Sequence, residues 1–321
     1  MPGLRGATVR GVDPGDTAAL ETYVRIRNTV APENTDSVEH VRWEVTTYPG
    51  EISHFLAEEA DGTPVGTAST GRIWMRERGY ERFWLGIWVV PDARSRGIGS
   101  ALYAAISGVA RAAGKTGFET GLSEAQTSGH RFLANRGFVE IDRDKMVRLD
   151  LAGLEPPEVG GPEGIRIESM AARPDLLTEV HAVAMDAFPD IPQDEPVHVG
   201  SLEDFAARDV DRVGIPKDAF FVALDDSSGE VAGYASLCYS AGSTTTAYHD
   251  MTAVRRAFRG RGIAGALKRA TIAWAVEHGL EALDTGNDEH NAPMRAVNLG
   301  LGYRPLPDSI GLRGPLAPDE T

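Results

Sequence analysis

The stretch RSRGIGSALYAAI, residues 94–106, returns as RGRGIAGALKRAT at residues 259–271. Each copy follows an apolar segment that is typical of a strand. From the fourth residue after the first arginine, apolar side chains recur every three or four positions, which predicts an amphipathic helix. Both stretches are therefore expected to form a glycine- and arginine-containing loop between a buried strand and a helix.

The spacing of the glycines shows that the whole chain repeats. Gly97 and Gly262 in the two loops are 165 positions apart, and the later glycines Gly137 and Gly302 are separated by the same interval. Because two landmarks share one interval, a duplicated domain explains them better than chance similarity.

The length of 321 residues suits two domains of about 150 residues each. Between the copies, residues 151–164 read LAGLEPPEVGGPEG, a stretch rich in Gly, Pro and Glu with no periodic apolar pattern, as in an exposed linker. We therefore expect an N-terminal domain over residues 1–150, this linker, and a C-terminal domain over residues 165–321.

The two copies predict the same order of elements. In the first copy these are helices over 16–30 and 38–46, a hairpin over 53–70, a strand over 84–90, the helix from 98, a strand over 117–122, another helix, and a strand from 137. In the second they are a hairpin over 220–239, a strand over 247–254, the helix from 263, a strand over 281–285, another helix, and a strand through Tyr303. Mostly antiparallel strands with helices on both faces predict an α/β sandwich of α+β type.

Composition excludes several classes of function. The formal net charge of −15 argues against a nucleic-acid partner, which is held mainly through Lys and Arg. No run of about 18 apolar residues could cross a membrane, and the opening MPGLRGATVR lacks the apolar part of a secretory signal, so we expect a cytoplasmic protein. The single cysteine, Cys238, excludes an intramolecular disulfide and suits a small buried hydrophobe.

The two loops are candidate phosphate sites, because amides at a helix N-terminus bind anions and glycines let the anion approach. Arginines at the first and third positions would add charge-assisted hydrogen bonds, so an anion with two phosphates fits best. The candidate residues are Arg94, Ser95, Arg96, Gly97, Ile98 and Gly99 in the first copy and Arg259, Gly260, Arg261, Gly262, Ile263 and Ala264 in the second.

The pattern Arg-x-x-Gly-x-Gly/Ala after an apolar strand resembles the pyrophosphate loop of the GNAT acetyltransferases, and the likeness covers nearly the whole chain except the linker. The tandem plan is similar to that of mycothiol-synthase-like members. The resemblance implies an N-acetyltransferase with acetyl-CoA or another acyl-CoA as co-substrate and no metal. The acceptor would be a primary amine of a small molecule, and the C-terminal module would be the catalytic one.

The resemblance also assigns binding residues. In the second copy, the strand residues Thr252, Ala253 and Val254 would hold the acyl carbonyl and the pantetheine arm, and Asn291 would contact pantetheine. Their counterparts on the strand of the first copy are Ile87, Trp88 and Val89.

Neither copy keeps the full set of the family. Where many members carry a tyrosine that protonates the departing thiolate, the second copy has Asn298 and the first has Leu133, and Gln126 takes the place of the pantetheine-binding asparagine. The first module would then bind acyl-CoA without transferring the acyl group, or serve as a structural partner.

The catalytic residues are less defined. His249 and Asp250 enter the strand near the expected acyl end, and either could act as a base through water. The more ordinary explanations are a structural histidine and an aspartate that caps the strand end or forms an ion pair. Tyr303 and Tyr248 are candidate acids, but a thiol pKa of about 8.5 makes an acid dispensable. A further polar group could face the substrate or simply cap a helix. It comprises Asp284, Asp288, Glu289 and His290. Their spacing matches no metal-ligand motif.

Two other functions remain open. GRGIAG at residues 260–265 is a literal GxGxxG, which permits a nicotinamide-dependent oxidoreductase, although Ser95 breaks the pattern in the duplicate and the loop follows a hairpin. A non-enzymatic acyl-CoA-binding or sensing protein is the stronger alternative, because both copies lack the tyrosine. The acceptor, the acyl group and the choice between monomer and dimer stay open.

Overall fold

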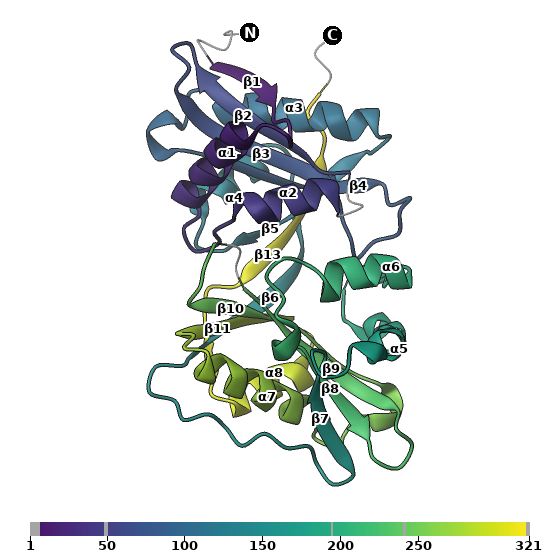
Figure 1. Cartoon of the computed structure of the whole chain (residues 1–321). Coiled ribbons are helices and arrows are strands. Elements are labelled where there is room, and N and C mark those ends of the chain that lie inside the picture. Colours follow the sequence, from purple (N-terminus) through teal and green to yellow (C-terminus); the bar gives the residue numbers. More distant parts are fainter. Residues whose placement is uncertain (1–6, 48–50, 194, 240–241, 319–321) are drawn as a thin grey trace. The chain divides into compact units, whose positions relative to one another are not determined.

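The computed structural model describes residues 7–47, 51–193, 195–239 and 242–318 (Figure 1). The chain divides into two compact units. Unit 1 comprises Met1–Ile141 together with Ile310–Thr321, and unit 2 comprises Asp142–Ser309. Each unit has the mixed, mostly antiparallel sheet flanked by helices that the sequence predicts.

Unit 1 contains a sheet in the order β1-β2-β3-β4-β5-β13. Its strands are β1 (Ala7–Gly11), β2 (Ser53–Glu59), β3 (Pro64–Arg72), β4 (Arg82–Val89), β5 (Gly117–Ser123) and β13 (Ser309–Pro315, counted here from Ile310). Its helices are α1 (Thr17–Val30), α2 (Val38–Thr46), α3 (Ile98–Ala112) and α4 (Thr127–Ala134), preceded at α3 by the short helix η1 (Pro91–Ala93).

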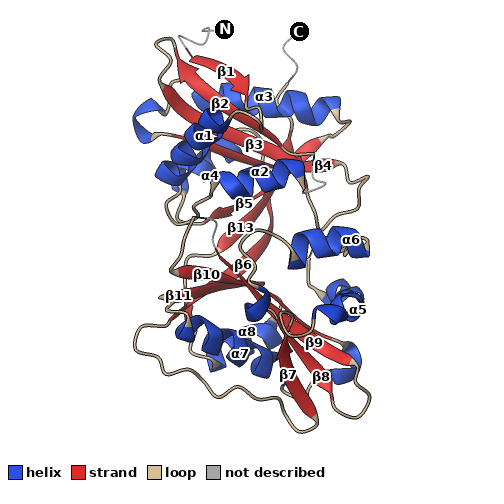
Figure 2. Ribbon diagram, viewed as in Figure 1, coloured by secondary structure: helices blue, strands red, loops and turns tan. Residues whose placement is uncertain are grey.

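The sheet of unit 1 has a hydrophobic core on each face. Leu102 and Ile106 of α3 pack with Phe83 and Leu85 of β4 on one side. On the other side α1 and α2 pack against β2, where Leu56 is fully buried. The layers of helix, sheet and helix can be followed in Figure 2. The expected helices over 16–30 and 38–46 and the hairpin over 53–70 are confirmed.

Unit 2 contains a sheet in the order β7-β8-β9-β10-β11-β6, with β12 also paired to β6. Its strands are β6 (Val139–Asp150, counted here from Asp142), β7 (Ile165–Ser169), β8 (Phe221–Asp225), β9 (Val231–Tyr239), β10 (Thr246–Val254), β11 (Ala282–Asp288) and β12 (Arg304–Pro305). Its helices are α5 (Leu177–Ala187), α6 (Leu202–Phe205), α7 (Ile263–Glu277) and α8 (Ala292–Gly300). Short helical turns are η2 (Pro174–Leu176), η3 (Phe188–Asp190), η4 (Ala206–Val210), η5 (Lys217–Ala219) and η6 (Arg256–Phe258).

The units differ from the contiguous ranges 1–150 and 165–321 because a strand at the end of each repeat lies in the other unit. Residues 144–150 of β6 pair antiparallel with β11 of unit 2. Strand β13, at the end of the chain, belongs to unit 1, where Tyr103 donates a hydrogen bond to the Pro315 carbonyl. Sequence periodicity indicates that a segment is a strand but carries no information about its partner.

The end of the second repeat also differs from expectation. The strand predicted through Tyr303 contains only Arg304 and Pro305, and the longer β13 after it was not expected. Residues 151–164 contain no helix or strand, as expected for a connection. Within the described ranges, no helix has both the length and the apolar character that a membrane crossing requires.

Candidate active site

The two loops have the same backbone conformation. Ser95 and Gly97 have φ of +61° and +89°, and Gly260 and Gly262 have φ of +76° and +80°. The first arginine of each loop closes back on the preceding strand: Arg94 Nε donates to Val89 O at 3.0 Å. Arg259 Nε likewise donates to Val254 O at 3.1 Å. The duplication inferred from the sequence is therefore also a duplication of loop geometry.

Each loop leaves room for an anion at the start of a helix of 15 residues. A Cβ placed on Gly97 or Gly262 would meet nothing within 4 Å. The first amides of a helix have no partner within it and carry the positive end of the helix dipole. This arrangement is suited to a phosphate that contacts the backbone directly.

The arginines around the loops lie in exposed ion pairs. In unit 2, Arg256 and Arg259 both contact Asp190 at 2.7 Å, and their hydrogen bonds lower the pKa of Asp190 to about 2. In unit 1, Arg96 pairs with Glu59 at 2.8 Å. Because these pairs are open to solvent, an anionic ligand could compete with the carboxylates for the guanidinium groups.

Beside each loop, two parallel strands separate. Strands β4 and β5 pair only from Arg82–Gly117 to Trp84–Glu119, and β10 and β11 only from Thr246–Ala282 to Tyr248–Asp284. All four strands continue beyond these pairs. Just past the separation, a threonine of the second strand donates a hydrogen bond to a carbonyl of the first strand. In unit 1, Thr120 Oγ1 donates to Leu85 O at 2.9 Å, and in unit 2, Thr285 Oγ1 donates to His249 O at 3.1 Å. In each unit the two strands therefore diverge toward the end of the first strand, which the loop follows.

Strand β10 carries one extra residue that β4 lacks. β10 has 9 residues and β4 has 8. The pairing of β10 with β9 shifts between His249–Leu237 and Thr252–Ala235, so Asp250 and Met251 both lie opposite Ser236. The pairing of β4 with β3 runs from Gly66–Val89 to Arg72–Phe83 without a shift. Such a bulge breaks the ladder, frees backbone groups and is common beside active sites.

The expected residues His249 and Tyr303 lie together, but within the core on the α7 side of β10. His249 is 1% exposed, and its ring contacts Tyr303 Oη through Nδ1 and Thr271 Oγ1 through Nε2, both at 3.2 Å. Burial, with the nearby charge of Lys268, holds the pKa of His249 well below its usual value. A neutral, enclosed imidazole with both nitrogens engaged is suited to positioning the strand.

Asp250 and Tyr248 lie one residue to either side of His249. Asp250 Oδ2 contacts Arg212 Nη2 at 3.0 Å, and both side chains are 25% exposed. Burial raises the pKa of Tyr248 above its usual value. Asp250 is thus the expected catalytic residue that lies at the bulge itself and keeps partial access to solvent.

The other expected polar residues of unit 2 are largely engaged in local structure. Asn291 Oδ1 caps α8 through Met294 N at 3.3 Å, and Asn298, which is 1% exposed, donates to Asn287 Oδ1 at 2.6 Å. The remaining four form ion pairs: Asp284 with Arg148, His290 with Asp288, and Glu289 with Lys145. By contrast, Thr252 Oγ1 is buried and has no hydrogen-bond partner within the described ranges.

Unit 1 differs at the position of the bulge. The ring of Trp88 lies against Gly86, so closely that any Cβ on Gly86 would clash with it. The guanidinium of Arg27 lies 5.2 Å from the centre of the same ring. Gln126 donates to Glu33 at 2.9 Å, and Leu133 is a core residue. The side of β4 that corresponds to the bulge is therefore filled by an aromatic side chain.

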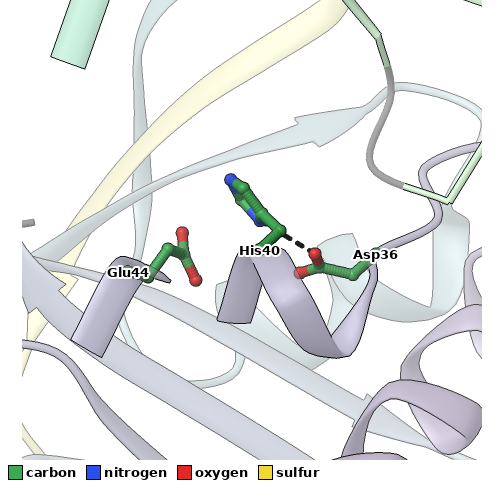
Figure 3. A group of neighbouring side chains, drawn as sticks. All are labelled: Asp36, His40 and Glu44. Atoms are coloured by element: carbon green, nitrogen blue, oxygen red, sulfur yellow. Dashed lines mark hydrogen bonds and ion pairs between the residues drawn. The ribbon is translucent and has the colours of Figure 1, made fainter. Parts of the chain in front are cut away.

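A group of side chains on α2 and just before it resembles a metal site but contains its own cation. Ligand atoms of Asp36, His40 and Glu44 lie within 4.8 Å of one another (Figure 3). Asp36 is buried, accepts from Ser37 N at 2.8 Å, contacts His40 Nδ1 at 2.8 Å and forms an ion pair with Arg27. Since the guanidinium already balances the buried carboxylate, the group is an ion-pair cluster that ties α1 to α2.

Sequence reasoning missed three features of unit 2. The bulge had a faint signal: the interval between equivalent residues is 165 at Val89 and Val254 but 164 at Trp84 and Tyr248. Arg212 and the buried Lys268 had no such signal, because the residues that they contact, Asp250 and Tyr303, are distant in the sequence.

Two units that each combine an anion-binding loop, a central helix and diverging strands define a tandem of acyltransferase-type α/β modules. The chain belongs to the acetyltransferase (GNAT) family, whose model matches residues 20–138 and again residues 177–303. The tandem GNAT resemblance seen in the sequence is thus confirmed, whereas the resemblance to mycothiol-synthase-like members stays a prediction.

Two solved structures share the fold. A tandem GNAT protein from the clavulanic acid biosynthesis pathway is 20% identical with a TM-score of 0.79, and the match covers 98% of this chain and 100% of that one. A GCN5-related N-acetyltransferase from Sphaerobacter thermophilus is 18% identical with a TM-score of 0.71, with 99% and 98% covered. No curated protein sequence matches this chain.

Proposed function

We propose that the chain is an acyl-CoA-dependent N-acyltransferase that moves an acetyl or another acyl group directly to a primary amine of a small molecule, and that unit 2 is the catalytic unit. The observation that carries this proposal is the bulge at Asp250 and Met251, which lies where β10 and β11 diverge beside the loop of Gly262. Strand β4 of unit 1 pairs without a shift.

The residues of unit 2 suit an acyl-CoA molecule. Its pyrophosphate would contact the amides that follow Gly262, with Arg259 and Arg261 at the mouth of the loop. The pantetheine arm would lie between the diverging strands, where Thr252 Oγ1 is a buried hydroxyl without a partner in the described part of the chain. Hydrogen bonding to the amides of the arm would satisfy this hydroxyl.

The chemistry needs few side chains. When bound, acyl-CoA supplies an acyl thioester, and the incoming amine nitrogen forms the C–N bond as the C–S bond breaks. Backbone N–H groups at the bulge would stabilise the negative charge that develops on the carbonyl oxygen. The proton lost by the amine passes to Asp250, directly or through water. Since a thiol has a pKa of about 8.5, the thiolate can leave without a dedicated acid, which fits the untitratable Asn298.

We propose that unit 1 binds acyl-CoA without transferring it, or acts as a structural partner. Its loop keeps the backbone of the unit 2 loop, but Trp88 fills the side of β4 where an acceptor would approach. The alternative function, an acyl-CoA-binding protein without turnover, is favoured by Asn298, a buried amide where the family commonly has a tyrosine. The net charge of −15 supports a small-molecule acceptor over nucleic acid.

Calorimetric titration of acetyl-CoA into the intact chain tests the proposal, with Gly262→Val and Gly97→Val as a matched pair. Both glycines have positive φ and open space at Cβ, so each valine blocks its loop at a similar cost in backbone strain. We expect Gly262→Val to lose the unit 2 site and thiol release with any amine, and Gly97→Val to keep thiol release. Wild-type chain that binds no acetyl-CoA would refute the acyltransferase, and unchanged binding in Gly262→Val would refute the loop assignment.

A further inference from the structure

A cluster of buried and half-buried charged side chains lies on the face of the unit 2 sheet opposite α7, next to the bulge. It joins Tyr234 of β9 and Asp250 of β10 to Arg208, Asp209 and Arg212 of the segment after α6. Arg208 and Asp209 are 7% and 13% exposed, and Tyr234 is fully buried. None of these side chains is among the acyl-CoA-binding residues described above. Asp250 also takes part in the proposed reaction as the proton acceptor.

The cluster is balanced in charge. Arg208 Nε donates to Asp209 Oδ2 at 2.6 Å, and Arg212 Nη2 donates to Asp250 Oδ2 at 3.0 Å. Two guanidinium groups therefore face two carboxylates. A ligand with net charge would leave one charge of the cluster uncompensated, whereas a ligand with one positive and one negative group keeps the balance.

Two hydrogen-bond donors of the cluster are unused. Tyr234 Oη and Arg212 Nε are buried and have no partner among the described residues. The phenol ring is fixed between Phe220, stacked at 5.3 Å between ring centres, and Phe205 at 6.3 Å. Both donors lie within electrostatic range of the same carboxylates, Asp209 and Asp250. Buried donors without partners are uncommon and point to a missing acceptor group.

We propose that the acceptor of unit 2 is a zwitterion of the α-amino-acid type, whose carboxylate accepts hydrogen bonds from Arg212 Nε and Tyr234 Oη while its amino group lies at Asp250. This assignment rests on the proposed function and names its substrate class. The amine is thereby held beside the bulge at Met251, where the acyl carbonyl is expected. The ammonium group first loses one proton to solvent, which makes the amine nucleophilic. As the C–N bond forms and the C–S bond breaks, the second proton goes to Asp250, and the products are an N-acyl amino acid and the CoA thiolate.

Acetylation of paired acceptors tests the substrate class. Thiol release from acetyl-CoA is measured with each of the common L-amino acids and with the corresponding amino acid amide, which keeps the amine and the side chain but lacks the carboxylate. We expect at least one amino acid to exceed its amide by tenfold or more in kcat/KM. Equal use of both members of every pair would overturn the inference and leave the acyltransferase function intact.

Tyr234→Phe supplies the matched variant, because it removes only the hydroxyl and keeps the packing against Phe220. We expect it to raise KM for the amino acid by about tenfold, with little change for the amide. Tyr239→Phe, on the same strand but packed against Trp274, is the control and should leave both unchanged. An equal loss of activity toward acid and amide in Tyr234→Phe would assign Tyr234 a structural role and overturn the carboxylate contact.

If the chain binds acetyl-CoA but acetylates no acceptor, the proposed function fails, and calorimetric titration of amino acids into the acetyl-CoA complex still decides the inference. Binding of an amino acid that Tyr234→Phe weakens would support the zwitterion site, and no binding of any amino acid would overturn it.

Discussion

Strands β4 and β10 occupy equivalent positions in the two units. The loops that follow them begin with the same backbone conformation. The dihedral angles φ and ψ of Arg94 and Arg259 are both −67° and 160°. Yet β10 holds one extra residue and β4 does not. The loop and the strand of the repeat can therefore change independently, and a preserved loop is no evidence of a preserved reaction.

The side chains around the two strands also differ. The position that Trp88 occupies in unit 1 belongs to Ala253 in unit 2, counted from the shared loop. The large ring lies over β4 beneath the Arg27 guanidinium, whereas unit 2 has a small side chain there and the Asp250–Arg212 pair nearby. Unit 2 thus combines a bulged backbone with a small side chain and a carboxylate, which suits the site that we propose for an incoming amine.

The largest expected effect comes from removing the bulge. Deletion of Met251 would give β10 the length and regular pairing of β4, and the amide directed at the carbonyl oxygen would return to the ladder. The loss of one such donor costs about 10²–10³ in kcat, so we expect thiol release to fall at least 100-fold while acetyl-CoA still binds.

Met251→Ala is the control for this deletion, since it shortens the side chain and keeps the extra backbone unit. We expect its turnover to stay within a few-fold of the unchanged chain. A deletion variant that is folded by circular dichroism and retains full turnover would show that the difference between β4 and β10 has no part in catalysis.

The second effect concerns the central helices. Lys268 of α7 occupies the position of Tyr103 in α3, and it is 2% exposed with its ammonium nitrogen 5.5 Å from the Tyr303 ring. Burial lowers the pKa of Lys268 to about 7. Between about pH 7 and pH 10 the unfolded chain, with a lysine pKa of about 10.4, binds a proton that the folded chain does not, so the stability of unit 2 rises with pH.

We expect Lys268→Met to remove this dependence and to stabilise unit 2 at pH 7, where the buried amine is least favourable. The slope lost is roughly 1.4 kcal/mol per pH unit within the window. Hydrogen exchange of α7 at several pH values measures it, and α3 in unit 1 serves as the internal reference. A variant whose exchange keeps the slope of the unchanged chain would place the titrating group elsewhere.

Local patterns predicted much of this comparison. The duplication, both loops and most helices could be derived because glycine spacing and apolar periodicity are contained in short segments. His249 and Tyr303 were chosen for their chemistry and do lie together, but their burial against α7 depends on which face of β10 each residue occupies.

The remaining features depend on strand partners. The exchange of β6 and β13 between the units, the bulge, and the pairing of Arg212 with Asp250 all require contacts between residues far apart in the sequence. A segment's own residues record its propensity and periodicity, and they leave its register with a distant strand undetermined.

The smallest expected effect concerns an acidic residue that differs in its contacts between the two units. Each unit has an acidic residue directly after a proline that follows its first long helix. In unit 1 this residue is Glu33, which contacts Gln126. In unit 2 it is Asp190, which contacts Arg256 and Arg259. Asp190 therefore competes with a phosphate for the same guanidinium groups. We expect Asp190→Asn to tighten acetyl-CoA binding at unit 2 by a few-fold, with less gain at high salt because exposed charges are screened.

Glu33→Gln is the matched control for this change and should leave the affinity of unit 2 for acetyl-CoA unaltered, since Glu33 contacts no residue of the unit 2 loop in the described structure. The pKa of Asp190 is about 2, so the carboxylate stays charged at pH 5 and pH 8 alike, and the gain measured by calorimetry should be the same at both. Weaker binding in Asp190→Asn would mean that the carboxylate holds the arginines in place for the phosphates, and that the loops of the two units differ in how they position their cations.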